Sequence, residues 1–178
     1  RKNKPMLNYS CKAVNYVNVK IPMRDGTNLI ADCYLPNAEG SFPVILCRSP
    51  YNVTSLRDGG ALICCERGFA YVGVDCRGRF KSEGFCDPGT YEINDGYDTI
   101  DWIAKQPWCN GNIGMVGGSY VAVTQLAAAA SGHPALKAIT PSAISCNFYD
   151  AYYTNGVLEL SFMPSWHIGM CERGRKIK

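Results

Sequence analysis

A serine on a glycine-rich turn is the feature of this chain whose residue type and spacing could perform covalent chemistry. Ser119 follows two glycines, with a short apolar run at 113–116 before it and an alanine-rich segment at 120–131 after it. A strand, a tight turn carrying serine and then a helix form a nucleophile elbow, in which small neighbours let the strand and helix approach closely. Gly117 meets that demand, but Val121 stands where a strict G-x-S-x-G pattern has glycine. The motif alone therefore leaves two interpretations, a nucleophile or a small residue at a turn between core elements.

The elements that must position Ser119 are expected to alternate between strands and helices. Asp25 and Gly26 predict a hairpin turn between the first two strands. A cap at Asp95 is expected to start the helix that Pro107 ends. The full set comprises strands at 16–21, 29–35, 42–47, 69–75, 113–116 and 136–139, and helices at 56–67, 95–106 and 120–131. This order predicts an α/β fold, a mostly parallel sheet with helices on both faces and its active face at the carboxyl ends of the strands.

The composition is that of a globular chain of 178 residues with a net charge of +3. Its lysines and arginines are scattered among acids without a basic stripe, so we expect no nucleic-acid partner. No apolar run approaches the roughly 20 residues that a membrane helix needs, so we expect no membrane partner.

Ten cysteines are more than a cytosolic enzyme usually carries. Cys33, Cys47 and Cys76 fall within or at the ends of apolar runs, which indicates small core residues. The sequence has no C-x-x-C pair, and the adjacent Cys64 and Cys65 do not have the usual spacing of a zinc knuckle. We therefore expect no metal and no cofactor. Unpaired cysteines favour a reducing cytoplasm, with a disulfide framework as the minority alternative.

Seven motifs occur in one order along the chain: IPMRDGT at 21–27, RSPY at 48–51, DCRGR at 75–79, SEG at 82–84, DGYDT at 95–99, QPWCNG at 106–111 and GGSY at 117–120. Together they resemble the cocaine esterase and X-prolyl dipeptidyl aminopeptidase family of α/β-hydrolases. The resemblance covers about residues 15–145 and implies an α/β-hydrolase fold of which this chain is the N-terminal portion. Residues 1–145 would form that part of the catalytic domain. Residues 146–178, which are rich in aromatic side chains, would begin a helical cap.

The resemblance also implies a site and a reaction. Matched position by position, Ser119 is the nucleophile that forms an acyl-enzyme, and the phenol of Tyr51 and the backbone N–H of Tyr120 are the oxyanion donors. Two donors placed where negative charge develops contribute roughly 3 kcal/mol each. The expected substrates are a small-molecule ester, an acyl amide or a short peptide. The family usually has glycine at Ala122, a change that helix packing is expected to absorb.

Three charged residues in the third and fourth motifs are expected to be structural. Asp75, Arg77 and Glu83 are interpreted as one charge network that fixes the loop, since an acid beside an arginine is stabilised as a carboxylate.

A serine hydrolase of this fold also needs an acid and a histidine base, which follow the nucleophile in that order. His133 lies past the far end of the elbow helix, where we expect a solvent or loop role, and His167 is expected to be packed or on the surface. The sequence predicts six strands where the family has eight, and the missing two are those that carry the acid and the histidine. We therefore expect the chain alone to be inactive, with an exposed apolar edge at 136–139 that favours homo-oligomers. The alternative is a non-catalytic interaction protein that retains part of the hydrolase fold and uses the aromatic segment 149–166 as a contact surface.

Overall fold

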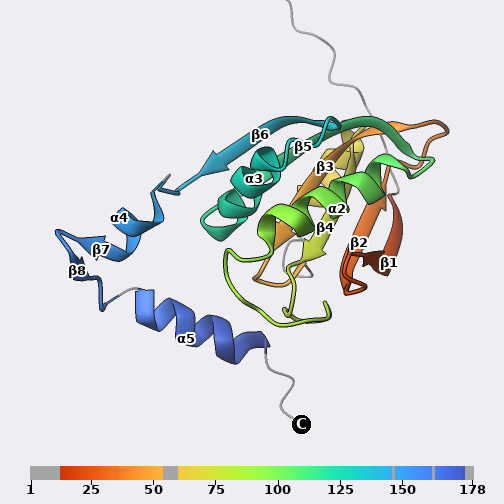
Figure 1. The fold of residues 1–178 in the computed structure, drawn as a ribbon. Coiled ribbons are helices and arrows are strands. Elements are labelled where there is room, and N and C mark those ends of the chain that lie inside the picture. The colour runs from red at the N-terminus through yellow and green to blue at the C-terminus, as the bar shows by residue number, and fades with distance from the viewer. Residues whose placement is uncertain (1–12, 54–59, 146, 162, 175–178) are drawn as a thin grey trace, which may run out of the picture.

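The computed structural model describes residues 13–53, 60–145, 147–161 and 163–174, and its centre is a six-stranded sheet (Figure 1). The strand order is β1-β2-β4-β3-β5-β6. β2 pairs antiparallel with β1 and with β4, whereas the β3–β4, β3–β5 and β5–β6 pairs are parallel. The strands are β1 (Val14–Pro22), β2 (Asn28–Leu35), β3 (Phe42–Ser49), β4 (Ala70–Asp75), β5 (Cys109–Gly118) and β6 (Leu136–Ser142). The expected mostly parallel α/β sheet is confirmed.

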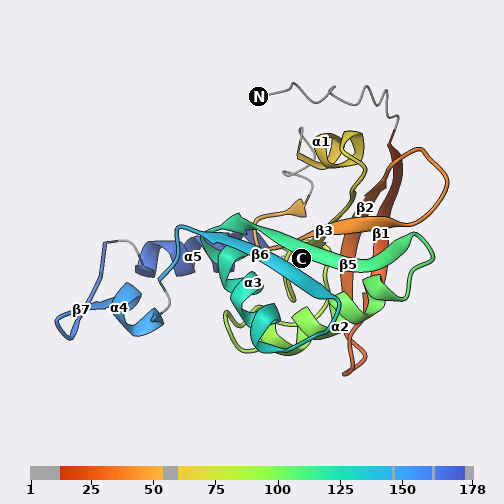
Figure 2. The same cartoon turned by 90° about the horizontal axis from the view of Figure 1, so that it is seen from above.

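Helices cover both faces of this sheet. α1 (Gly60–Glu66) lies on one face, and α2 (Glu92–Ala104) and α3 (Tyr120–Ala130) lie on the other (Figure 2). Ile100 and Ile103 of α2 are fully buried in the main hydrophobic cluster with sheet residues. On the opposite face, Ala61 and Cys65 of α1 pack in a second cluster. The first four residues of the helix expected at 56–67 lie outside the described residues.

Two local predictions have different outcomes. The turn at Asp25 and Gly26 joins β1 to β2 as expected: Gly26 has a φ of 84°, and its N–H donates to the carbonyl of Met23 over 2.9 Å. The cap predicted at Asp95 is wrong, because α2 begins three residues earlier, after Tyr91. Asp95 lies inside the first turn, buried, and pairs with Arg77. Its carboxylate is favourable there because it faces both an arginine and the positive end of the helix.

The C-terminal segment continues beyond β6 (Figure 1). It contains α4 (Phe148–Tyr152), a short hairpin of β7 (Tyr153–Thr154) and β8 (Val157–Leu158), and α5 (Met163–Gly174). α5 packs against the body formed by the sheet and its helices, since Trp166 stacks on the ring of Tyr120 with 5.7 Å between ring centroids. A domain boundary near residue 145 stays a prediction. In the described part of the chain, every helix is too short or too polar to span a bilayer.

Candidate active site

Ser119 sits on a strained turn between β5 and α3. Its φ of 57° and ψ of −131° place a non-glycine residue in a sparsely populated region of backbone space. Hydrogen bonds hold the turn on both sides: the N–H of Ser119 donates to the carbonyl of Ser142, at the carboxyl end of β6, over 3.0 Å. The carbonyl of Ser119 accepts from the N–H of Ala122 over 2.9 Å. The predicted strand, serine turn and helix are therefore present.

Gly117 explains why Val121 fits into this elbow. Gly117 has a φ of 134°, and a Cβ atom at this position would lie 2.4 Å from Cγ1 of Val121. The isopropyl group of Val121 thus occupies the volume that a side chain at 117 would take. Ala122 is fully buried, so the methyl group that replaces the usual glycine fits the packed interior of α3.

Tyr51 lies beside Ser119 although 68 residues separate them. β3 and β5 are parallel neighbours, so the residues after their carboxyl ends meet at one edge of the sheet. The phenol oxygen of Tyr51 is 3.4 Å from Oγ of Ser119. The backbone N–H of Tyr51 donates to Oγ of Ser49 over 3.1 Å. The N–H of Tyr120 belongs to the first turn of α3, where no helix carbonyl accepts it. The three residues expected to act together are brought together.

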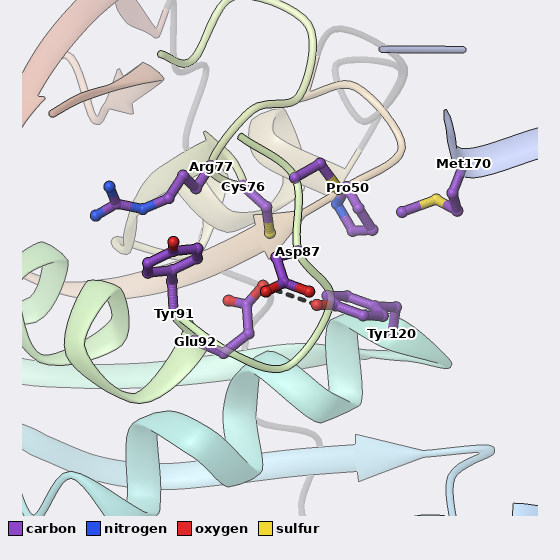
Figure 3. A pocket seen from close by; sticks show the side chains of 9 residues that line it. Pro50, Cys76, Arg77, Asp87, Tyr91, Glu92, Tyr120 and Met170 are labelled. Carbon is purple, nitrogen blue, oxygen red and sulfur yellow. Dashed lines mark hydrogen bonds between the residues drawn. The ribbon is translucent and has the colours of Figure 1, made fainter. Parts of the chain in front are cut away.

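The side chain of Tyr120 is anchored below the elbow. Its hydroxyl donates to Oε1 of Glu92 over 2.9 Å (Figure 3). The same hydroxyl accepts from the N–H of Gly89 over 3.0 Å. Burial, and then the charge of Glu92, raise the pKa of the Tyr120 phenol, which stays protonated as a donor. Together with the stack on Trp166, these contacts fix the residue that follows Ser119.

A buried ion pair supports this anchor, and the sequence did not point to it. Arg48, fully buried, places Nη2 2.8 Å from Oε2 of Glu92 and donates from Nη1 to the main-chain carbonyl of Glu92 over 3.0 Å. Glu92, Tyr120, Cys76 and Asp87 line a cavity of about 10 Å³ (Figure 3). This is room for about one water molecule, so the cavity is too small for a substrate. A charged residue directly after the apolar run 42–47 was the one sequence feature that could have suggested a buried arginine.

A larger cleft opens beside Tyr51. It measures about 170 Å³ and lies between Tyr51, Arg79 and Phe80 on one side and Trp166 and Met170 of α5 on the other. One wall carries the tyrosine that contacts Ser119, so this cleft adjoins the elbow.

The single charge network expected at Asp75, Arg77 and Glu83 is wrong. Arg77 pairs with Asp95 over 2.6 Å and with Asp25 over 2.7 Å. Asp75 instead accepts from the N–H of Val53 over 2.8 Å, and burial raises its pKa to about 6.

Glu83 has a different set of partners. Its Oε2 accepts from the backbone and side-chain N–H groups of Asn28, both over 3.0 Å, and these bonds lower the pKa of Glu83. The three residues do not form one network because each lies beside a different segment: Asp75 beside Val53, Arg77 beside Asp25 and Asp95, and Glu83 beside Asn28.

The two histidines lie on different elements. His133 lies in the loop after α3, as expected, but it is buried rather than solvent-facing, which corrects the solvent part of the expectation. Its Nδ1 accepts from the N–H of Ala135 over 3.1 Å, and its ring packs edge-on to Tyr97. His167 belongs to α5, with Nε2 3.4 Å from the hydroxyl of Tyr152.

The cysteines singled out in the sequence lie in the interior. Cys33, Cys47 and Cys76 are buried free thiols, as expected of core residues. Across the described ranges, no three His, Cys, Asp or Glu side chains are arranged to hold a metal ion.

Comparison with known proteins gives consistent matches. The cocaine esterase of Rhodococcus sp. (strain MB1 Bresler) is 43% identical over 156 residues, which cover 84% of this chain and 27% of the relative. A putative Xaa-Pro dipeptidyl-peptidase of Streptomyces avermitilis is 33% identical over 116 residues, covering 56% of this chain and 17% of the relative. The crystal structure of a CocE/NonD family hydrolase from Staphylococcus aureus superposes with a TM-score of 0.81 at 27% identity, covering 91% of this chain and 33% of that one.

These matches define both the family and the extent of the chain. The chain spans 27% to 29% of the length of the curated relatives that it matches over most of its own length. The family model for X-Pro dipeptidyl-peptidase (S15 family) matches residues 25–176. The matched range includes Tyr51, Ser119 and Tyr120. With the α/β-hydrolase sheet and the serine elbow in place, this chain belongs to the X-Pro dipeptidyl-peptidase (S15) family of serine hydrolases.

Proposed function

We propose that this chain is the nucleophile-bearing part of a serine hydrolase that cleaves a carboxylic ester, an acyl amide or a short peptide. The observation that supports this best is the 3.4 Å approach of the Tyr51 phenol to Oγ of Ser119 at a strained elbow. Strain at one serine and a phenol held beside it by the segment after another strand are typical of a reaction centre rather than of a turn between core elements.

In the proposed reaction, Oγ of Ser119 attacks the substrate carbonyl carbon and gives up its proton to a base. The carbonyl π electrons move to oxygen, where the phenol of Tyr51 and the N–H of Tyr120 donate to the developing oxyanion. Collapse of this intermediate breaks the bond to the alcohol or amine, which takes a proton and leaves an acyl-enzyme. Water then attacks the acyl group and releases the acid, restoring Ser119.

The base and its orienting acid are not assigned to residues of this chain. His133 is committed to Ala135 and Tyr97 at the other end of α3, and His167 lies beside Tyr152 on α5. We therefore propose that the chain alone has no turnover and that the base and acid come from sequence beyond it. We also propose a cytoplasmic location, since Cys33, Cys47 and Cys76 are buried thiols rather than disulfide-bonded.

A fluorophosphonate probe tests the proposed roles, because it phosphonylates an activated serine. We would measure the labelling rate by intact mass with imidazole added as an external base. Tyr51→Phe is expected to slow labelling about 100-fold, the usual effect of losing one oxyanion donor. Tyr149→Phe is the matched control, since this tyrosine is exposed and stacks on Tyr153 in the C-terminal segment.

The outcomes separate the two hypotheses. Equal rates for Tyr51→Phe and Tyr149→Phe would remove Tyr51 from the mechanism. A chain that is never labelled at Ser119 but forms a stable complex with another protein would favour the non-catalytic alternative.

A further inference from the structure

Arg79 is a buried cation that joins three segments of the chain. Its side chain is 1% exposed and belongs to the loop after β4. Nε donates to the main-chain carbonyl of Pro50 over 2.9 Å, and Nη1 donates to the main-chain carbonyl of Met170 in α5. Its guanidinium also lies over the ring of Phe80, 5.2 Å from the centroid. One planar group with several fixed donors thus links segments that are 29 and 91 residues away from it in sequence.

The two carbonyls that Arg79 holds lie next to the candidate oxyanion donors. Pro50 directly precedes Tyr51, so a bond to its carbonyl restrains the peptide that carries the phenol. Met170 lies one helical turn after Trp166, which stacks on Tyr120. Figure 3 shows Pro50, Met170 and Tyr120 on the same side of the small pocket. Tyr51 is therefore linked to Arg79 through Pro50, and Tyr120 contacts α5 through Trp166.

We propose that Arg79 is a positioning residue that fixes Tyr51 against α5, so that the seating of α5 sets the geometry of the oxyanion hole. The role assigned to Tyr51 rests on the proposed function. Arg79 itself does not touch the reacting atoms; it acts through the carbonyl of Pro50. Lysine at this position cannot reproduce the effect, because its single ammonium group cannot span both carbonyls with the fork geometry of a guanidinium.

The neighbouring Arg77 offers a matched comparison. It lies two residues away in the same loop and is also buried, but it pairs with Asp25 and Asp95 rather than with the carbonyls of Pro50 and Met170. Loss of Arg77 therefore disturbs the β1–β2 turn and the start of α2, whereas loss of Arg79 disturbs Tyr51 and α5.

Hydrogen–deuterium exchange of the 178-residue chain tests the positioning role without needing turnover. Arg79→Lys is expected to speed exchange about tenfold at the amides of Tyr51 and Val53 and in residues 163–170 of α5, because local opening becomes easier. These two amides report directly on the segment, since they donate to Oγ of Ser49 and to Oδ1 of Asp75. Arg77→Lys is expected to leave both segments unchanged.

Two results would overturn the proposal: unchanged exchange in both segments of Arg79→Lys, or the same acceleration there in Arg77→Lys. If Arg79→Lys does not fold, Arg79→Gln is measured in the same way. If neither variant folds while Arg77→Lys does, Arg79 serves global stability and the positioning role is lost.

Labelling of Ser119 in imidazole separates this proposal from the proposed function. If Arg79 acts through Tyr51, Arg79→Lys slows labelling in the wild-type background and has no further effect in Tyr51→Phe, the signature of two residues acting as a unit. If Tyr51→Phe leaves the labelling rate unchanged while Arg79→Lys speeds hydrogen exchange as expected, the oxyanion role is refuted and the positioning role is kept. The opposite pair of results would keep the oxyanion role and refute the positioning role.

Discussion

The packing of Gly117 against Val121 makes a sharp prediction about stability. An alanine at 117 would place its Cβ 2.4 Å from Cγ1 and 2.9 Å from Cβ of Val121. Overpacking of this kind costs about 1–3 kcal/mol, and a non-glycine residue at a φ of 134° costs about 1–3 kcal/mol more. We therefore expect Gly117→Ala to lower the free energy of unfolding by roughly 4 kcal/mol.

A second variant separates the two contributions. Val121→Gly removes both short contacts, at a cost of its own of about 0.4 kcal/mol in helix propensity plus the lost burial of the valine. The double variant Gly117→Ala/Val121→Gly keeps the backbone strain but not the overlap. It should therefore be less destabilised than the sum of the two single variants by about 1–3 kcal/mol.

Urea unfolding followed by far-UV circular dichroism measures all four proteins, and equal m-values confirm that the unfolded states are comparable. Gly117→Ala within about 0.5 kcal/mol of wild type would refute the steric reasoning, as would additivity of the two changes within that margin.

Three further predictions concern the rest of the fold. Burial raises the pKa of Asp75 from 3.8 to about 6, so the native state binds more protons than the unfolded state between these two values. The free energy of unfolding therefore falls as pH rises through this window, by at most about 1.4 kcal/mol per pH unit. Asp75→Asn should remove that slope in urea unfolding measured from pH 4 to 6, and an unchanged slope would contradict the assignment. Glu92→Gln leaves the charge of the buried Arg48 without its partner and should cost about 3–5 kcal/mol of unfolding free energy, whereas a loss under about 1 kcal/mol would mean that the pair is well solvated. β6 is an edge strand among the described residues, so the chain should self-associate and Ala138→Lys should shift it towards monomer in light scattering; a monodisperse wild-type monomer would disprove this.

The sheet was predictable because its patterns are local. Apolar runs of strand length and the turn at Asp25 and Gly26 identified all six strands, although β5 extends well beyond the expected 113–116. The start of α2 was not predictable in the same way. Asp95 has the residue type of a cap, but Arg77, a long-range partner, holds it inside the helix.

The site was predictable in part, for two different reasons. The turn around Ser119 is encoded locally by its glycines, and Tyr51 was expected only through the family resemblance, since nothing near it in sequence suggests a role. The pair of Arg48 and Glu92 was missed because 44 residues separate them and only the fold brings them together. The burial of His133 was missed for the same reason, because Tyr97 of α2 covers its ring.

The most direct test of the account is where a fluorophosphonate probe attaches to this chain when imidazole supplies the missing base. The account predicts a single adduct on Ser119, mapped by peptide mass, that forms faster as imidazole is raised and is abolished in Ser119→Ala. No adduct at any imidazole concentration, or an adduct that persists in Ser119→Ala, would contradict the assignment of Ser119 as the nucleophile.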